Sequence, residues 1–383
     1  MKLKMIIAVF LCAAMLLAGV AGCNDPDGDD VDSSLSDGPP VGNAGAFVGP
    51  GIDFNAAFSA FKPSTVMFTA GEYTATWAEL FTFLFSGVNG MLANFPGVPD
   101  WNADVGNGSS FAETIIEYSI NDVMFFKSLQ YGSELLGAQL TPLDEQLLSE
   151  SINNMINQAG SVEEFSEMLW DHSGIYSLGL FEYLMTTEYL MSRIVVTLYG
   201  EHASLIPDNE VAEIIEDGDF LMAMHILRSR MEGEDAHLPI FFLEEILEAL
   251  DNYDGDDFVQ FFTEVMLENT EDVGGLSAYP HGYLFQEGDM FPEFYNAVVA
   301  LEIGELSGIV ETEHGFHIIL RLPINYDVVP IAASFQGDTR SLRHVAAFIL
   351  FEPVMQEWRE AIAPVFTEDF ESFDFATVFA WQD

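Results

Sequence analysis

Residues 311–323, ETEHGFHIILRLP, contain two histidines three positions apart, just before an apolar stretch. His314 and His317 could be metal ligands, a catalytic pair, or two side chains with unrelated roles. On a helix this spacing would bring both rings to one face, but here the pair spans a predicted turn and the start of a predicted strand. A zinc site would also need further ligands from nearby elements. The residue types alone leave the three alternatives open.

The elements that must position these histidines form an α+β pattern that begins near Phe220. The stretch FLMAMHILRSR is apolar, contains His225, and predicts a strand. LEEILEALDN and DDFVQFFTEVML predict two helices, and a Gly-rich loop follows them. In GDMFPEFYNAVVALEIGE, Met290 and Phe294 are predicted to lie on one face of a third helix. SGIVETEHGFHIILRL then predicts strand, turn and strand, so residues 218–324 have the size of one small α+β domain.

The segments on both sides of this domain have helical patterns. Thr141, Pro142 and Asp144 predict an N-cap, a first-turn proline and a capping box. After Pro323, the apolar stretch LRHVAAFILFEPVMQEWREAIAPVF predicts one or two helices, which need an apolar surface to cover. We therefore expect one mostly α-helical domain that is split into residues 56–217 and 325–383, with the α+β domain inserted between them.

The N-terminal residues predict export. A basic start, an apolar run too short for a typical membrane span and the small residues Val20-Ala21-Gly22 are typical of a secretory signal, here residues 1–22. Cys23 follows directly, as in the lipobox of bacterial lipoproteins, where this thiol is lipidated. The alternative is an ordinary signal peptide with an incidental cysteine. Residues 23–55 are rich in Asp, Gly, Ser and Pro and predict an acidic flexible tether.

The charge balance and the cysteines restrict partners and stabilising bonds. The net charge is −51, which disfavours nucleic acid and anionic lipid surfaces as partners. The only other cysteine, Cys12, lies inside the predicted signal, so no internal disulfide is expected in the processed chain. With 49% hydrophobic residues, the chain has enough apolar side chains to be held together by its core.

Four motifs in order resemble the parvulin-type peptidyl-prolyl cis/trans isomerases. They are the opening MHILRSR strand, the Met and Phe four residues apart, the Gly-Glu-[Leu/Ile]-Ser step, and the Thr-x-x-Gly-[Phe/Tyr]-His-Ile-Ile strand, which is TEHGFHII here. The helical segments on both sides resemble the chaperone domain of extracytoplasmic foldase lipoproteins of the PrsA type. The resemblance implies a parvulin-like domain, a small antiparallel sheet with flanking helices, inserted into a split helical chaperone domain.

The resemblance also implies roles for individual residues. His225 and His317 would form a hydrogen-bonded pair under the reacting amide, and Thr312 would support them. Asp272 matches the position of an aspartate or cysteine beside the substrate carbonyl, although the loop before Tyr283 varies in length and leaves Glu271 as a competing candidate.

A proline pocket would be formed by Met290 and Phe294, with Phe285 as a further wall. His314 would lie at the rim, where it could bind substrate. Rotation about an X–Pro bond makes and breaks no covalent bond, so neither a metal nor a cofactor is expected.

Two functions follow as hypotheses. The first is a prolyl isomerase and foldase that is lipid-anchored to the outer face of the cytoplasmic membrane and acts on unfolded or partly folded exported polypeptides with X–Pro bonds. The second is a holdase-type chaperone whose isomerase domain has weak activity or none. Arg228 and Arg230 follow the first strand, but acidic residues come directly after them, so a preference for phosphorylated substrates is not expected.

Overall fold

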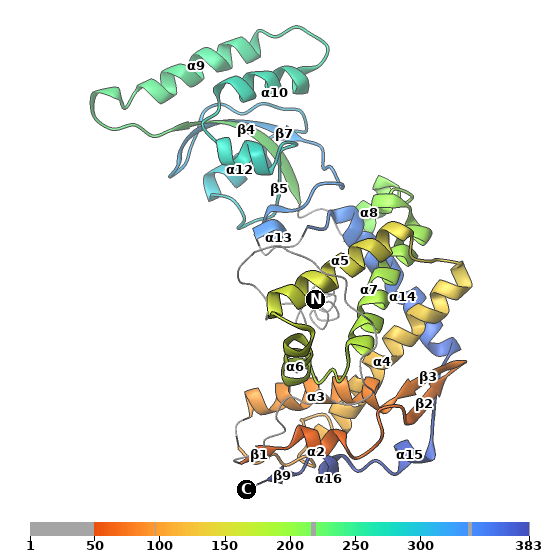
Figure 1. Ribbon diagram of the computed structural model, residues 1–383. Helices are drawn as coiled ribbons and strands as arrows, with labels where there is room; N and C mark the ends of the chain where they lie inside the picture. Colours follow the sequence, from red (N-terminus) through yellow and green to blue (C-terminus); the bar gives the residue numbers. More distant parts are fainter. Residues whose placement is uncertain (1–49, 96, 216–219, 336–338, 383) are drawn as a thin grey trace. The chain divides into compact units, whose positions relative to one another are not determined.

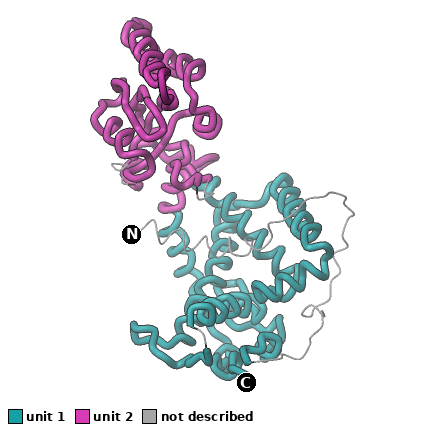
Figure 2. The backbone as a smooth tube through the Cα atoms, turned by 90° about the vertical axis from the view of Figure 1, so that its left-hand side faces the viewer, with its two compact units in different colours: residues 1–198, 351–383 teal, residues 199–350 magenta. Residues whose placement is uncertain are grey.

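The structure is a computed structural model that describes residues 50–95, 97–215, 220–335 and 339–382. It divides the chain into two compact units, shown in different colours in Figure 2. Unit 1 consists of residues 1–198 and 351–383, and unit 2 consists of residues 199–350. The predicted signal, Cys23 and most of the predicted tether lie outside the described residues. No helix of the described part of the chain is long and apolar enough to cross a membrane.

Unit 1 is mainly helical. Its helices are α2 (Phe54–Phe58), α3 (Trp77–Asn94), α4 (Phe111–Leu136), α5 (Pro142–Ala159), α6 (Val162–Ser173), α7 (Leu178–Tyr199), α15 (Glu368–Glu371) and α16 (Phe375–Val378). Its strands are β1 (Gly51–Ile52), β2 (Val66–Ala70), β3 (Tyr73–Thr76), β8 (Pro364–Phe366) and β9 (Trp381–Gln382). Helix α14 (Leu342–Ala361) begins in the residues of unit 2 and ends in those of unit 1.

The start and the end of the described chain meet in unit 1. Strand β1 pairs with β9, and β2 pairs with both β3 and β8 in a sheet of order β3-β2-β8. The sequence patterns did not predict these strands, because each has only a few residues and its partner can lie some 300 positions away. The tether was predicted to extend to residue 55, whereas Ile52 is already buried in the unit 1 core.

Aromatic side chains fill the core of unit 1. Phe81 stacks on Trp170 with ring centroids 5.8 Å apart, and Phe379 from the C-terminal segment lies against Phe81 at 5.9 Å. In α4, Gly132 lies so close to Trp358 of α14 that an added Cβ would overlap the indole ring. The C-terminal segment therefore packs on the N-terminal helices through matched aromatic contacts. The predicted capping box of Thr141 and Asp144 is present at the start of α5.

Unit 2 contains the small antiparallel sheet that the sequence predicted. Its strands β4 (Leu221–Ser229), β5 (Tyr283–Phe285), β6 (Val310–Glu311) and β7 (Gly315–Leu322) have the order β5-β4-β7-β6. Its helices are α8 (Asp208–Ile215), α9 (Leu238–Asp251), α10 (Phe258–Asn269), α11 (Val273–Ala278), α12 (Pro292–Ala300) and α13 (Ile331–Phe335), with short 3-10 turns η1 (Glu201–Ala203) and η3 (Gly233–Asp235).

The two faces of this sheet are covered by different helices (Figure 1). Alternate residues of β4 and β7, including Met224 and Ile318, pack with α9 and α10. The residues between them, including Ala223 and Ile319, pack with Phe294 of α12. This alternation is the period-two pattern expected for a strand that is buried on both faces.

Unit 2 extends beyond the predicted range of 218–324. Ile331 of α13 and Leu342 at the start of α14 are buried in its two cores, so these flanking segments belong to the same compact unit. The predicted boundary between residues 217 and 218 lies outside the described residues. The sequence pattern missed the extension because the added helices look like the helical segments of the other unit.

Candidate active site

Two neighbouring strands place the predicted histidine pair. In the β4–β7 register, Leu227 lies opposite His317, and His225 lies opposite Ile319. Residues two apart share a face of a strand, so the two imidazoles are diagonal neighbours on the face that α12 covers. Their Nδ1 atoms are 2.9 Å apart, and the residues are only 7% and 4% exposed.

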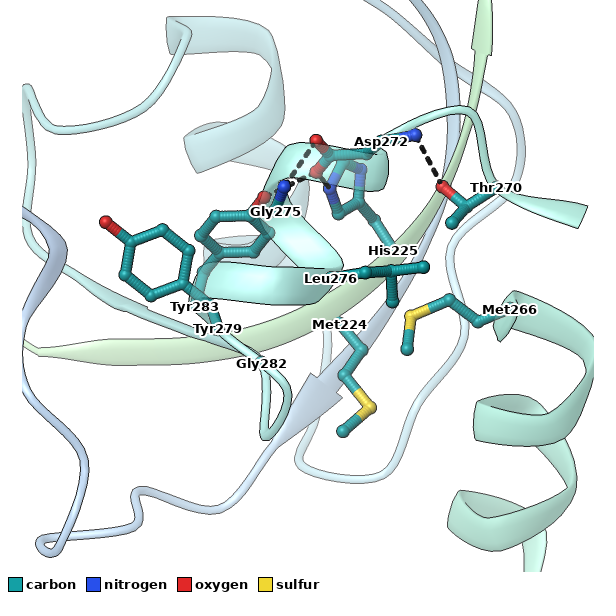
Figure 3. A pocket seen from close by; sticks show the side chains of 10 residues that line it. All are labelled: Met224, His225, Met266, Thr270, Asp272, Gly275, Leu276, Tyr279, Gly282 and Tyr283. Atoms are coloured by element: carbon teal, nitrogen blue, oxygen red, sulfur yellow. Dashed lines mark hydrogen bonds and ion pairs between the residues drawn. The ribbon is translucent and has the colours of Figure 1, made fainter. Parts of the chain in front are cut away.

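Asp272 closes one end of this pair, and Figure 3 shows its contact with His225. It is the N-cap of α11, where its Oδ1 accepts the N–H of Gly275 at 3.0 Å. Its Oδ2 lies 3.0 Å from His225 Nε2 and also accepts the hydroxyl of Tyr283. The hydrogen bond from His225, followed by those from Tyr283 and Gly275, holds the pKa of the Asp272 carboxyl well below its usual range, although partial burial opposes the shift.

The loop that carries Asp272 is tied to β4. The Thr270 hydroxyl accepts the backbone N–H of Leu227 at 3.0 Å and that of Asp272 at 3.2 Å. Glu271, the competing candidate, contacts Arg228 at 3.1 Å and accepts the N–H of Ser229 at 2.8 Å. The structure therefore brings Asp272, and not Glu271, to the histidine pair.

Thr312 closes the other end of the pair. Its Oγ1 lies 2.7 Å from His317 Nε2, and its backbone N–H donates to the carbonyl of Gly315 at 2.8 Å. Gly315 begins β7 with a φ of 155°, and an added Cβ would lie 2.2 Å from the Arg228 carbonyl oxygen. A side chain at position 315 would therefore push β7 away from β4 and break the turn that brings Thr312 back to His317.

The hydrogen-bond partners determine where the protons lie when both rings are neutral. An ionised Asp272 can only accept, so His225 carries its proton on Nε2 and accepts with Nδ1. His317 must then donate from Nδ1 and accept the Thr312 hydroxyl with Nε2. All four ring nitrogens are therefore used within the protein. Burial, together with the neighbouring His225 and His314, lowers the pKa of His317 to about 3 and keeps this ring neutral.

An apolar wall lies against the histidine pair. Phe294 is 1% exposed, and its ring stands almost perpendicular to both imidazoles, 5.3 Å from His225 and 5.6 Å from His317. Phe285 is fully buried 5.9 Å from Phe294. Met290 packs on the same cluster but precedes α12, so the prediction that it shares a helical face with Phe294 is wrong. Pro292 occupies the first turn and starts the helix two residues after Met290.

His314 lies apart from the pair. It is exposed, and its ring contacts Phe291 at 4.8 Å, at the edge of the apolar wall. Within the described ranges, no group of three or more His, Cys, Asp or Glu side chains has the geometry to hold a metal ion.

Several residues of the site were not predicted. Figure 3 shows a small cleft beside Asp272 that is lined by Met224, His225, Met266, Thr270, Asp272, Gly275, Leu276, Tyr279, Gly282 and Tyr283. Of the lining residues that were not predicted, Thr270, Gly275 and Tyr283 hydrogen-bond directly to Asp272. A signal for Tyr283 exists in the sequence: if Phe285 faces the pocket, the strand alternation places Tyr283 on the same face.

Comparisons with known proteins find a domain family within unit 2. Residues 243–322 match a family model described as "Rotamase: PPIC-type PPIASE domain". That match includes Asp272, Phe294, Thr312 and His317, whereas His225 precedes it.

Relatives of known name extend the similarity beyond this domain. The chain is 25% identical over 240 residues to the Foldase protein PrsA of Halalkalibacterium halodurans, covering 57% of this chain and 66% of that protein. It is 40% identical over 67 residues to the Foldase protein PrsA of Caldanaerobacter subterraneus, covering 17% of this chain and 20% of that protein. The chain thus spans slightly less than two thirds of the first relative and about one fifth of the second.

Among solved structures, the foldase protein PrsA from Lactococcus lactis has a TM-score of 0.31 and 14% identity, covering 82% of this chain and 98% of that one. PrsA from Bacillus subtilis has a TM-score of 0.28 and 15% identity, covering 73% and 94%.

Proposed function

We propose that this chain is a foldase that catalyses cis/trans isomerisation of X–Pro bonds in exported polypeptides. The starting point is the PPIC-type peptidyl-prolyl isomerase domain, to which residues 243–322 belong. The observation that carries the proposal is the buried His225–His317 pair, closed by Asp272 and Thr312 and walled by Phe294.

The chemistry of the bond defines what such a site must do. An X–Pro amide isomerises over a barrier of about 18–20 kcal/mol and takes tens to hundreds of seconds unaided. Midway through the rotation, the amide has lost its resonance and is less polar than in either planar form. A site that holds the proline ring in apolar surroundings and fixes the twisted amide therefore lowers the barrier through binding that is strongest in the transition state.

The residues of this site are suited to those two tasks. Phe294, Phe285 and Met290 would receive the proline ring. The histidines would act as a rigid polar floor and not as proton donors to substrate, because their ring nitrogens are already bonded to each other, to Asp272 and to Thr312.

The charges beside the site point to a substrate class. Arg228 contacts Glu271 at 3.1 Å, and Arg230 contacts Glu311 at 2.8 Å, so both guanidinium groups already have carboxylate partners. A phosphate on the residue before proline would have to displace these partners and would meet an acidic protein. We therefore propose unphosphorylated segments as substrates, with a neutral or basic residue before proline.

The proposed location is the extracytoplasmic face of the bacterial membrane. The first 22 residues would be removed as a signal, and a lipid on Cys23 would anchor the chain through the acidic tether of residues 23–55. The two relatives described above are both named foldase proteins, which supports folding polypeptides as the partners. Replacement of Cys23 by Ala should release the protein from the membrane fraction, and mass spectrometry should show the loss of the lipid.

A protease-coupled proline-peptide assay tests the activity. We expect His225→Ala and His317→Ala to bring the rate close to the uncatalysed one, while the control His237→Ala, at an exposed position of the same unit, leaves it unchanged. Circular dichroism checks that each variant is folded. Wild-type protein that does not accelerate isomerisation, or folded histidine variants that match it, would contradict the proposal. If such a protein still suppressed aggregation of unfolded chains, the holdase hypothesis would replace the foldase hypothesis.

A further inference from the structure

Tyr283 makes a contact to the site that the residue patterns did not predict. It lies in β5, opposite Ala223 of β4, and its ring stands 5.3 Å from that of His225. Its hydroxyl donates to Oδ2 of Asp272, the same oxygen that faces His225 Nε2 at 3.0 Å. The phenol therefore reaches the histidine pair through the carboxylate and without a hydrogen bond of its own to either ring among the described contacts.

Gly275 provides the space for this contact. A Cβ added at position 275 would lie 1.7 Å from the Tyr283 hydroxyl oxygen and 2.2 Å from Asp272 Oδ2. The backbone N–H of the same glycine donates to Oδ1 of Asp272 at 3.0 Å. Only a residue without a side chain can give that N–H and leave the phenol and the carboxylate in contact.

His225 Nε2–H, the Gly275 N–H and the Tyr283 hydroxyl together fix the plane of the Asp272 carboxylate. Without the tyrosine, Asp272 would keep one backbone donor and His225, and its terminal torsion, which is broad for this side chain, would be less restricted. A rotated carboxylate would no longer require the proton of His225 to lie on Nε2. The order of donors and acceptors through His317 to Thr312 depends on that single proton.

We propose that Tyr283 is a positioning residue for the isomerase reaction: its hydroxyl holds the Asp272 carboxylate in the orientation that sets the tautomers of His225 and His317. This inference rests on the function proposed above. Partial burial and the adjacent Asp272 carboxylate both raise the pKa of the Tyr283 hydroxyl, so it remains a protonated donor at neutral pH.

The first test is Tyr283→Phe in the full chain, with Tyr253→Phe as the matched control. The control removes another tyrosine hydroxyl of unit 2, which donates to a backbone carbonyl at Asp257, away from the histidines. We expect Tyr283→Phe to lower kcat about tenfold, the factor that corresponds to one lost hydrogen bond to a charged group, with KM unchanged. The control should keep wild-type kcat and KM.

A second readout separates positioning from a general effect on folding. The ¹⁵N chemical shifts of imidazole nitrogens distinguish Nδ1–H from Nε2–H tautomers. In the wild-type protein we expect one tautomer each, Nε2–H for His225 and Nδ1–H for His317, and in Tyr283→Phe a mixture. Gly275→Ala keeps the phenol but forces it away from the carboxylate, so it should give the same loss of kcat and the same mixture.

The outcomes distinguish this inference from the proposed function. If the wild-type chain does not accelerate isomerisation, the proposed function is wrong and the role of Tyr283 falls with it. If the wild-type chain is active and Tyr283→Phe retains its kcat and its single tautomers, the positioning role is refuted and the isomerase function stands. A variant that changes KM alone would also refute it, because that result indicates direct contact with substrate.

Discussion

Replacement of Asp272 by Asn tests the proton arrangement of the site most directly, because it keeps the shape of the side chain and removes its charge. The N–H of Gly275 donates to Oδ1 and the Tyr283 hydroxyl to Oδ2, so an amide keeps an acceptor at only one of these two positions and has a donor nitrogen at the other. If that nitrogen faces His225 Nε2, the ring must accept there and donate from Nδ1. His317 would then accept at Nδ1 and donate from Nε2 to the Thr312 oxygen. The direction of every hydrogen bond from residue 272 through the two histidines to Thr312 would be reversed.

The expected cost follows from the surroundings of the carboxylate. Its side chain is 25% exposed, so solvent weakens the interaction only in part. Loss of one net charge-assisted hydrogen bond should lower the free energy of unfolding of unit 2 by about 2 kcal/mol at pH 7. Because folding depresses the pKa of Asp272, this contribution is complete above the unfolded value of 3.8 and is lost as the pH falls through the lower folded value. The difference in the free energy of unfolding of unit 2 between wild type and variant should therefore narrow by about half near pH 3.

The two units allow an internal control in this experiment. All the tryptophans lie in unit 1: Trp77, Trp101, Trp170, Trp358 and Trp381. Tryptophan fluorescence during urea unfolding therefore follows unit 1, whereas amide hydrogen exchange in β4 and β7 follows unit 2. We expect Asp272→Asn to change only the second signal. If the difference in unit 2 unfolding free energy between wild type and Asp272→Asn stays constant from pH 7 to pH 3, the argument that the charge of Asp272 stabilises the site is refuted.

Three further predictions concern other parts of the molecule. Phe294→Ala should lower kcat/KM in the peptide assay and lower the free energy of unfolding of unit 2 by about 3–5 kcal/mol, because it removes a buried ring beside the histidines. An unchanged kcat/KM in folded protein would exclude Phe294 from the proline pocket. Thr312→Ala should lower kcat and give a mixture of His317 tautomers, whereas Thr312→Ser should keep the wild-type kcat and a single tautomer. A serine variant with a kcat as low as that of the alanine variant would contradict the role of the hydroxyl. Lys127→Met should cost about 3–5 kcal/mol in unit 1, followed by tryptophan fluorescence, because it leaves Glu79 buried without its ion partner; a stability equal to wild type would show that this buried pair is not needed.

Local patterns were sufficient for much of unit 2. The alternation in β7 predicts that Phe316, Ile318 and Leu320 share one face and that His317 lies on the other, and the cores have this arrangement. Pairing His225 with His317 needed more, because these residues are 92 positions apart and the register of their strands is set by tertiary packing. The family resemblance supplied that register, and periodicity alone could not.

The features that the sequence did not predict have three physical origins. Strand β8 pairs with β2 across almost the whole length of the chain, and a three-residue strand has too few positions to show a period. Met290 was assigned to a helix because its spacing from Phe294 fits one turn, yet Pro292 starts that helix later. The contact of Tyr283 with Asp272 depends on the empty space at Gly275, which becomes evident only when the loop has its three-dimensional shape.

The same hydrogen bonds answer the question raised by the spacing of His314 and His317. A metal ion on His317 would need a free ring nitrogen, but Nδ1 faces His225 and Nε2 faces Thr312. Binding a metal would break one of these bonds and leave a buried partner unsatisfied, at a cost of about 1–3 kcal/mol before any ligand is gained. His314 lies on Phe291, outside this closed set. The two histidines that lie close in sequence are therefore not the two that contact each other, because side chains of adjacent antiparallel strands meet across the sheet and not along one strand.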